Sequence, residues 1–246
     1  MDIEQTAARN LEALSRNSYP GRGMIVGLTP DARHFVQVYW IMGRSENSRN
    51  RIFVPGGAGT ERGLVRTAPY DKSKVKDPSL IMYNCARQFE RCHIVSNGDQ
   101  TDTVLDVMQR GGSFEEALFT RSAEPDAPNF TARITGLADL DDGVHAYKLS
   151  VIKVLGNNPD HGVRQFFNYA SAIPGIGHCV HTYAGDGEPL PCFEGEPYAV
   201  ALSDDTDAVA ERYWDVLDRD NRVSLLAKFI DARTGAVNLR IVNKHG

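Results

Sequence analysis

The chain has 246 residues, of which 41% are apolar and 24% are charged, and its formal net charge is −5. This balance is typical of a globular protein with a substantial core, and the acidic net charge disfavours a nucleic acid as partner. No stretch approaches the roughly 18 uninterrupted apolar residues expected of a membrane span, and residues 1–17 lack the apolar core of a secretion signal. Four cysteines without a CxxC pair favour a reduced, cytoplasmic setting.

The first part of the chain predicts a short helix followed by strands. Leu11 and Leu14 share one side of a helix expected over residues 3–17. The segments 23–28 and 34–42 are rich in apolar, β-branched and aromatic residues and are separated by a Thr-Pro-Asp turn, so we expect them to pair as a hairpin. Further strands are expected at 52–54, 64–67, 80–85 and 92–96, and a flexible insertion at 55–60.

The second part of the chain predicts helices between further strands. A helix is expected over residues 101–110, with Gly111 as its stop, and a capping box from Ser113 to Glu116 begins another that ends near Thr120. Residues 156–196 are rich in glycine and proline and give no assignment. The remaining expected elements are strands at 131–137, 145–155, 198–202, 223–230 and 236–242 and a helix at 205–217. This pattern predicts the α+β class and one domain over residues 1–246.

The densest functional signal is the segment 44–51, which carries three arginines among serine and asparagine side chains. Arginine forks bind phosphate oxygens bidentately, and hydroxyl and amide groups add neutral donors. Arg22, between two glycines just before the first expected strand, could join them. A solvated charged loop has the same composition, so the residues alone leave both interpretations open.

Three other segments carry weaker signals of the same kind. Residues 95–102 run from a strand end into a helix start, where backbone N–H groups could hold a polar ligand or simply be capped. Residues 124–133 form a proline-stiffened loop in which a carboxylate could serve as a base or lie in a plain connector. Tyr83, at the end of an expected strand, could donate to an oxyanion or belong to the core.

Other kinds of site find little support in the sequence. The His178-Cys-Val-His181 run, with Cys192 downstream, fits no standard zinc spacing. Cys85 lacks a recognisable nearby base, and neither a P-loop nor a dinucleotide-binding glycine motif is present. We therefore expect no metal and no cofactor.

Five short segments of the sequence, taken in their order along the chain, form a pattern that can be compared with known families. They are Tyr-Pro-Gly-Arg-Gly-Met-Ile-Val-Gly at 19–27, Arg-Ser…Asn-Arg at 44–51, Tyr-Asn-Cys at 83–85, Val-Ser-Asn-Gly-x-x-Thr-Asp at 95–102 and Asn…Thr-x-Arg-Ile at 129–134. Together they resemble the archaeal-type inosine monophosphate (IMP) cyclohydrolase family, and the resemblance is specific over residues 19–134. Residues 1–18 and the glycine-rich stretch 55–63 look like additions to that pattern.

The resemblance implies a four-layer αββα sandwich like that of the N-terminal-nucleophile hydrolases, without a self-processed nucleophile. It also implies conversion of 5-formamidoimidazole-4-carboxamide ribonucleotide into IMP and water, the last step of de novo purine synthesis. The expected partner is that small purine ribonucleotide, with no nucleic acid and no membrane, and a homo-oligomer is left open.

The resemblance also suggests residue roles. Glu124 is expected to take the carboxamide proton, Tyr83 to donate to the formyl oxygen, and Arg51 to orient the base or offset charge. The looser spacing of this chain leaves Asp126 as an alternative to Glu124, and Arg49 as an alternative to Arg51.

Substrate binding is assigned in the same way. The 5′-phosphate is expected at Arg22, Arg44 and Ser45. The residues expected to frame the base and the ribose are Asn84, Asn97, Thr101, Asp102 and Arg133.

Two alternatives to a cyclohydrolase stay open at this point. An amidohydrolase on the same scaffold would need a nucleophile or an activated water, at Cys85 or in the 178–192 group. A non-catalytic purine-nucleotide-binding protein would keep the arginines and tolerate the loss of Tyr83 and Glu124.

Overall fold

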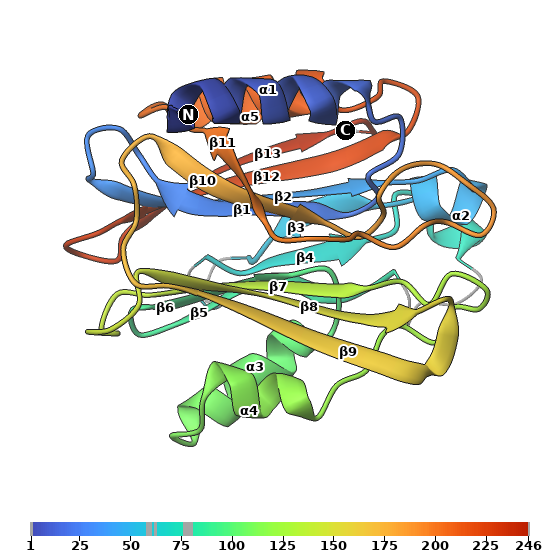
Figure 1. Cartoon of the computed structure of the whole chain (residues 1–246), viewed down its shortest axis with the longest axis horizontal. Coiled ribbons are helices and arrows are strands. Elements are labelled where there is room, and N and C mark those ends of the chain that lie inside the picture. Colours follow the sequence, from blue (N-terminus) through green and yellow to red (C-terminus); the bar gives the residue numbers. More distant parts are fainter. Residues whose placement is uncertain (1, 58–60, 62, 76–80, 246) are drawn as a thin grey trace.

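The computed structural model describes residues 2–57, 61, 63–75 and 81–245 and consists of two antiparallel sheets with helices on their outer faces (Figure 1). Within the described residues, six strands form one sheet in the order β11-β10-β1-β2-β12-β13. Their bounds are β1 Gly23–Leu28, β2 His34–Met42, β10 Ile176–His181, β11 Tyr198–Ala201, β12 Arg222–Asp231 and β13 Val237–Asn243.

The other sheet of the described chain has seven strands in the order β3-β4-β5-β6-β7-β8-β9. Their bounds are β3 Ile52–Pro55, β4 Val65–Ala68, β5 Asn84–Phe89, β6 Cys92–Ser96, β7 Arg133–Asp139, β8 Tyr147–Leu155 and β9 Asn158–Tyr169. Figure 1 shows the two sheets facing each other, with their remaining faces turned toward the helices.

Helices α1 (Ile3–Arg16) and α5 (Thr206–Val216) pack on the six-stranded sheet, and α3 (Gln100–Gln109) and α4 (Phe114–Phe119) pack on the seven-stranded sheet. Helix α4 begins at the predicted capping box, in which Ser113 and Glu116 each bond the other's backbone N–H. Helix α3 is followed by Gly111, whose φ of +83° is readily adopted only by glycine. The short helix α2 (Glu46–Arg49) lies within the polar 44–51 segment and was not predicted.

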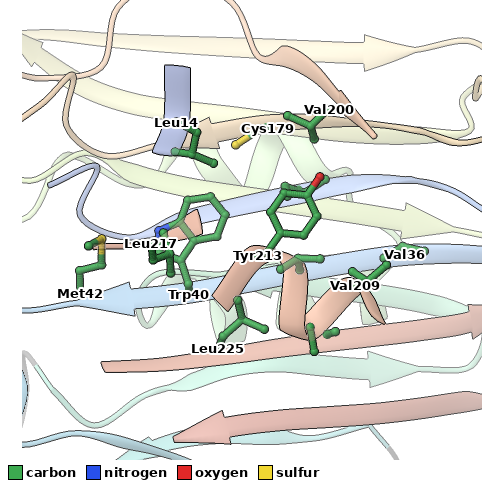
Figure 2. Packing of buried hydrophobic residues seen from close by; sticks show 14 of the residues in the cluster. Leu14, Val36, Trp40, Met42, Cys179, Val200, Val209, Tyr213, Leu217 and Leu225 are labelled. Atoms are coloured by element: carbon green, nitrogen blue, oxygen red, sulfur yellow. The ribbon is translucent and has the colours of Figure 1, made fainter. Parts of the chain in front are cut away.

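Three apolar clusters fill the spaces between these layers. Under α1 and α5, Tyr213 and Leu14 pack against the outer face of the six-stranded sheet, which presents Trp40 and Val36 (Figure 2). A second cluster lies between the sheets, and a third joins α3 and α4 to the seven-stranded sheet. Burial of these apolar faces is the main force that holds the layers together.

The predicted hairpin of β1 and β2 is confirmed, and its register places Gly23 opposite Trp40. A Cβ at Gly23 would come within 2.0 Å of the Trp40 indole ring, so the close approach of β1 to this side chain requires glycine. The predicted hairpin near Thr234 is confirmed as β12 and β13.

The strand expected at residues 80–85 is wrong in its bounds, because β5 begins only at Asn84. Ile81 and Tyr83 are buried, but Met82 is half exposed, and Tyr83 is fixed by backbone and side-chain hydrogen bonds with Thr67. Ile81 and Tyr83 are therefore apolar or aromatic because they are buried, although they are not in a strand. Residue 80 of the expected strand lies outside the described residues, and so do residues 58–60 of the expected flexible insertion.

Two strands were missed in the stretch 156–196. Strand β9 is an edge strand with largely exposed polar residues in its first half, so it lacks the apolar alternation that predicts a strand. Strand β10 is almost wholly buried but lies among glycine-rich and proline-rich turns. The α+β class is confirmed. In the described part of the chain, no helix combines the length and apolarity that crossing a membrane requires.

Candidate active site

A cavity of about 290 Å³ lies at the end of the six-stranded sheet where β1 begins and β2 ends. Its wall contains the guanidinium groups of Arg22, Arg44 and Arg51 and the carboxylates of Glu124 and Asp126. Neutral polar groups come from Ser45, Asn47, Ser48 and Asn129. Three of the segments that the sequence singled out, at residues 22, 44–51 and 124–133, therefore meet in one place.

A larger hollow of about 590 Å³ lies beside α1 and includes Leu14, His181 and Tyr198 in its lining. Burial lowers the pKa of His181 to about 4, and its Nδ1 lies 2.7 Å from the carbonyl oxygen of Tyr183. The smaller cavity brings buried cations and a buried carboxylate together, which is the arrangement that acid–base chemistry on an anionic substrate requires. We therefore take the smaller cavity as the candidate site.

Arg22 and Glu124 form a buried ion pair in this cavity, with 3.3 Å between Nη2 of Arg22 and Oε2 of Glu124. The Arg22 backbone N–H donates to the Thr182 hydroxyl, and the Glu124 N–H donates to the Thr131 carbonyl, so both residues are held by their main chains. Burial raises the pKa of Glu124 above its ordinary value, and the charge of Arg22 opposes that rise. A carboxylate of this kind can take a proton from a bound substrate near neutral pH.

Arg51 lies beside this pair and is only 2% exposed. Its Nε and Nη2 donate to the carbonyl oxygens of Ser48 and Met42, at 2.8 and 3.2 Å. Burial lowers the pKa of Arg51, and the nearby charge of Arg22 acts in the same direction. These contacts fix the guanidinium group in a set orientation within the cavity wall.

Tyr83 interacts electrostatically with both Arg51 and Arg22, and its hydroxyl lies 2.7 Å from the hydroxyl of Tyr39. Burial raises the pKa of Tyr83, while the two arginines oppose that rise. Tyr83 is not itself part of the cavity wall, although two of the arginines with which it interacts are. Its phenol is protonated at neutral pH and can donate a hydrogen bond.

Arg44 and Ser45 occupy the more open part of the cavity. The Arg44 guanidinium lies 5.1 Å from the centre of the Tyr19 ring and forms a salt bridge with Asp186. Ser45 caps α2 by accepting a hydrogen bond from the Ser48 N–H at 3.1 Å. An arginine beside hydroxyl groups can bind a phosphate, which would have to compete with the Asp186 carboxylate.

The two alternatives left open by the spacing, Asp126 and Arg49, have other partners. Asp126 lines the cavity, but its carboxylate accepts hydrogen bonds from the N–H and the hydroxyl of Thr131. Arg49 donates to the Gly43 carbonyl and to Asn221 and is not part of the cavity wall. The geometry therefore favours Glu124 and Arg51 for chemistry in this cavity.

The residues expected to frame the base and ribose are not part of the cavity wall. Asn84 donates to both carboxylate oxygens of Asp102, at 3.0 and 3.2 Å, and Asp102 also pairs with Arg87. These side chains form a polar group between β5 and α3.

The remaining three predicted binding residues lie around the start of α3 and the start of β7. The side chain of Asn97 is fully buried, donates to the Ala132 carbonyl and accepts from the Ile134 N–H. The Thr101 hydroxyl bonds the Gly98 carbonyl, and Arg133 pairs with Asp99. These hydrogen bonds give the polar residues at 95–102 a structural role that needs no ligand.

Sequence reasoning missed two tyrosines at or next to the site, Tyr39 and Tyr183, and it marked the segment of Asn129 without giving that residue a role. Tyr39 lies within a strongly apolar strand, where an aromatic residue is expected for packing alone. The Tyr183 hydroxyl contacts the Thr131 hydroxyl, and the side-chain oxygen of Asn129 accepts from the Leu190 N–H at 3.0 Å. Only the fold brings the two tyrosines to this site, and no local spacing marks them.

The cysteine and histidine group lies elsewhere in the fold. The Cys85 thiol donates to the Val65 carbonyl, and burial raises its pKa, which disfavours the nucleophilic thiolate. The ring of His178 lies 2.5 Å from the Tyr147 hydroxyl, whereas His181 packs against Phe193. Among the described residues, no three histidine, cysteine or acidic side chains are grouped as metal ligands would be.

Comparison with known proteins agrees with the resemblance predicted from the five segments. The family model of the IMP cyclohydrolase-like proteins matches residues 19–235, which extends well beyond residue 134. A protein of Methanopyrus kandleri named IMP cyclohydrolase is 32% identical over 125 residues. That match covers 49% of this chain and 59% of the relative, so the chain spans little more than half the length of this relative. The chain belongs to the family of IMP cyclohydrolase-like proteins.

Proposed function

We propose that this protein is an IMP cyclohydrolase that closes the pyrimidine ring of 5-formamidoimidazole-4-carboxamide ribonucleotide with loss of water. Family membership supports this substrate class. The observation that carries the proposal is the buried pair of Arg22 and Glu124 in a cavity that also presents Arg44 and Arg51. A nucleotide monophosphate needs cations at one end of its site, and the ring closure needs a base at the other.

The proposed reaction begins with attack of the carboxamide nitrogen on the formyl carbon. Glu124 removes one proton from that nitrogen, and Tyr83 donates its proton to the formyl oxygen, which becomes a hydroxyl group. The C–O bond then breaks, and the hydroxyl leaves as water with the proton held by Glu124. The formamido nitrogen gives its proton to Tyr83, so both side chains return to their starting states.

The arginines have separate roles in this scheme. Arg22 keeps Glu124 oriented and offsets its charge, so we assign it to the base rather than to the phosphate. Arg51 stabilises the negative charge that develops near Tyr83, and such a donor typically contributes about 10²–10³-fold in rate. Because both reacting groups belong to one molecule, the protein has only to hold them in plane and to place protons.

The phosphate is proposed to bind at Arg44 and Ser45. The contacts to base and ribose are proposed for Asn47 and Asn129, because both line the cavity. Within the described residues, the Asn47 side-chain oxygen is buried without a hydrogen-bond partner, so it can accept from a ribose hydroxyl. The five residues expected from the 84–133 segments bond to other parts of the fold, so this proposal gives them no contact with the substrate.

We also propose that the paired sheets and their helices form the four-layer αββα sandwich of the N-terminal-nucleophile hydrolase type. The order of layers in Figure 1 supports this assignment. The proposed mechanism uses no residue at the N-terminus.

The first experiment follows ultraviolet absorbance while the purified protein acts on the formamido ribonucleotide, without folate and with a chelator present. We expect IMP to form at a rate proportional to protein concentration. Binding of IMP without turnover would overturn the proposed activity and leave a nucleotide-binding protein. If the protein shows no turnover and does not bind IMP, the substrate assignment is overturned as well.

A further inference from the structure

The hydroxyl groups of Tyr39 and Tyr83 join the two sheets through one buried hydrogen bond of 2.7 Å. Tyr39 lies on β2 of the six-stranded sheet, and Tyr83 immediately precedes β5 of the seven-stranded sheet. Tyr39 is fully buried and its ring packs against Phe53 at 5.4 Å between ring centres, whereas Tyr83 is 8% exposed. Tyr39 is therefore less accessible to solvent than Tyr83.

The burial of the two hydroxyl groups indicates the direction of this bond. Each phenol is the other's hydrogen-bond partner among the described residues, so one of the two protons is left without an acceptor there. That cost is greater for Tyr39, which is fully buried, than for Tyr83, which is 8% exposed. Donation by Tyr39 therefore satisfies the more deeply buried proton and leaves the proton of Tyr83 uncommitted.

The charges around the pair favour the same direction. Arg51 and Arg22 each interact electrostatically with both phenols, and for each arginine the interaction with Tyr83 is larger than the interaction with Tyr39. The other titratable group that faces both phenols is the buried thiol of Cys85. Negative charge is therefore better tolerated on Tyr83, and the phenol that tolerates charge better is the better acceptor.

We propose that Tyr39 is a positioning residue that donates to the Tyr83 oxygen and thereby directs the Tyr83 proton toward the substrate. This inference rests on the proposed cyclohydrolase function. As the Tyr83 proton moves to the formyl oxygen, the phenolate keeps the Tyr39 hydrogen bond and the nearby arginine charges. Tyr39 itself exchanges no proton with the substrate, so it acts entirely through Tyr83.

The test compares Tyr39→Phe with Tyr213→Phe, a matched variant that also loses a buried tyrosine hydrogen bond, to the Ala201 carbonyl, in the cluster under α5. We expect Tyr39→Phe to lower kcat about tenfold with little change in KM, because one hydrogen bond to the developing phenolate is lost. Tyr213→Phe should leave both constants near those of the unaltered protein. Equal kcat values for the two variants would overturn the proposal.

The pH profile separates positioning from a loss of packing. Without the Tyr39 donor, the pKa of Tyr83 rises, so the alkaline limb of kcat should move to higher pH in Tyr39→Phe. Fluorotyrosine placed site-specifically at position 39 is a stronger donor of nearly the same size and should move that limb to lower pH. Shifts in the same direction for both variants, or no shift, would contradict the proposed donation.

The double variant Tyr39→Phe/Tyr83→Phe, together with the two single variants, forms a double-mutant cycle. We expect it to be no slower than Tyr83→Phe alone, because Tyr39 acts only through Tyr83. Additive losses would show that Tyr39 acts independently and would overturn the proposal. If the unaltered protein has no turnover, the proposed function itself has failed. That result is distinguishable from a failure of the Tyr39 proposal, in which the unaltered protein is active.

Discussion

The Arg22 guanidinium lies 3.3 Å from the Glu124 carboxylate, and the two side chains are 12% and 7% exposed. Arg22 approaches from the start of β1, and Glu124 comes from the loop that leads into β7, so the pair connects the two sheets. A base made in this way depends on both sheets for its position.

Glu124→Gln should lower kcat by about 10²–10⁴-fold, because the amide keeps the shape of the side chain but cannot take a proton. Steady-state kinetics with the formamido ribonucleotide measure this loss. Glu12→Gln is the matched control, since Glu12 is an exposed carboxylate paired with Arg16 on α1. Near-normal turnover of Glu124→Gln would exclude Glu124 as the base.

The acidic limb of kcat/KM should have its midpoint above 4.5, the ordinary pKa of a glutamate, because burial raises the pKa of Glu124 and the base must be ionised. The same shift affects stability. A carboxyl whose folded-state pKa is raised stabilises the fold below its unfolded pKa, and this contribution is lost as pH rises through the folded pKa.

The free energy of unfolding should therefore contain a component that falls with pH from 4.5 up to the raised pKa, and Glu124→Gln should lack it. Urea denaturation of both proteins across this pH range checks the sign. Identical pH dependences would show that the pKa of Glu124 is not raised in the folded protein.

Arg44→Ala should raise KM for the ribonucleotide about tenfold with little effect on kcat, because the proposed phosphate contact is made equally in ground and transition states. Asp186→Asn should do the opposite and lower KM several-fold, since it removes the carboxylate that competes for Arg44. The pair is partly exposed, so added salt should reduce the difference between Asp186→Asn and the unaltered protein. A raised KM in Asp186→Asn would show that Asp186 supports binding instead.

Gly23→Ala should destabilise the fold by about 1–3 kcal/mol, because a Cβ there would overlap the Trp40 ring at 2.0 Å. The strand would have to move, and Arg22 is the adjacent residue, so turnover should fall as well. Gly143→Ala is the control, because a Cβ at Gly143 meets nothing within 4 Å. Denaturation midpoints of the two variants give the comparison, and equal midpoints would contradict the packing argument.

The sequence predicted the elements that have a strong local signal, which is a continuous apolar run for a buried strand and a cap or a glycine for a helix end. The apolar strands β1, β2 and β12, the capping box of α4 and the glycine stop after α3 all have local signals that tertiary packing did not override. Strand β9 escaped prediction because its first half is polar and exposed, and the apolar run at 80–85 was misassigned because Tyr83 is buried without being in a strand.

The candidate site was predictable in part, because the residues marked its segments and the family resemblance gave the residues their roles. Arg22, Arg51 and Glu124 lie in three of those segments, and the structure brings them into one cavity. Asn97 and Thr101 were also named through the resemblance, but their side chains bond to the backbone at Ala132 and Gly98. A sequence does not distinguish a side chain that satisfies a ligand from one that satisfies a buried main chain, since both need the same polar atoms.

The two contacts that the proposals use, between Arg22 and Glu124 and between Tyr39 and Tyr83, each join a residue on or beside the six-stranded sheet to a residue in a segment that leads into the seven-stranded sheet. The apolar side chains between the sheets therefore set the separation of these groups as well as the stability of the fold. A substitution there that widens the gap by a fraction of an ångström would loosen the base and the acid together. If the proposed function holds, substitutions in this core should therefore lower turnover at positions that touch no substrate.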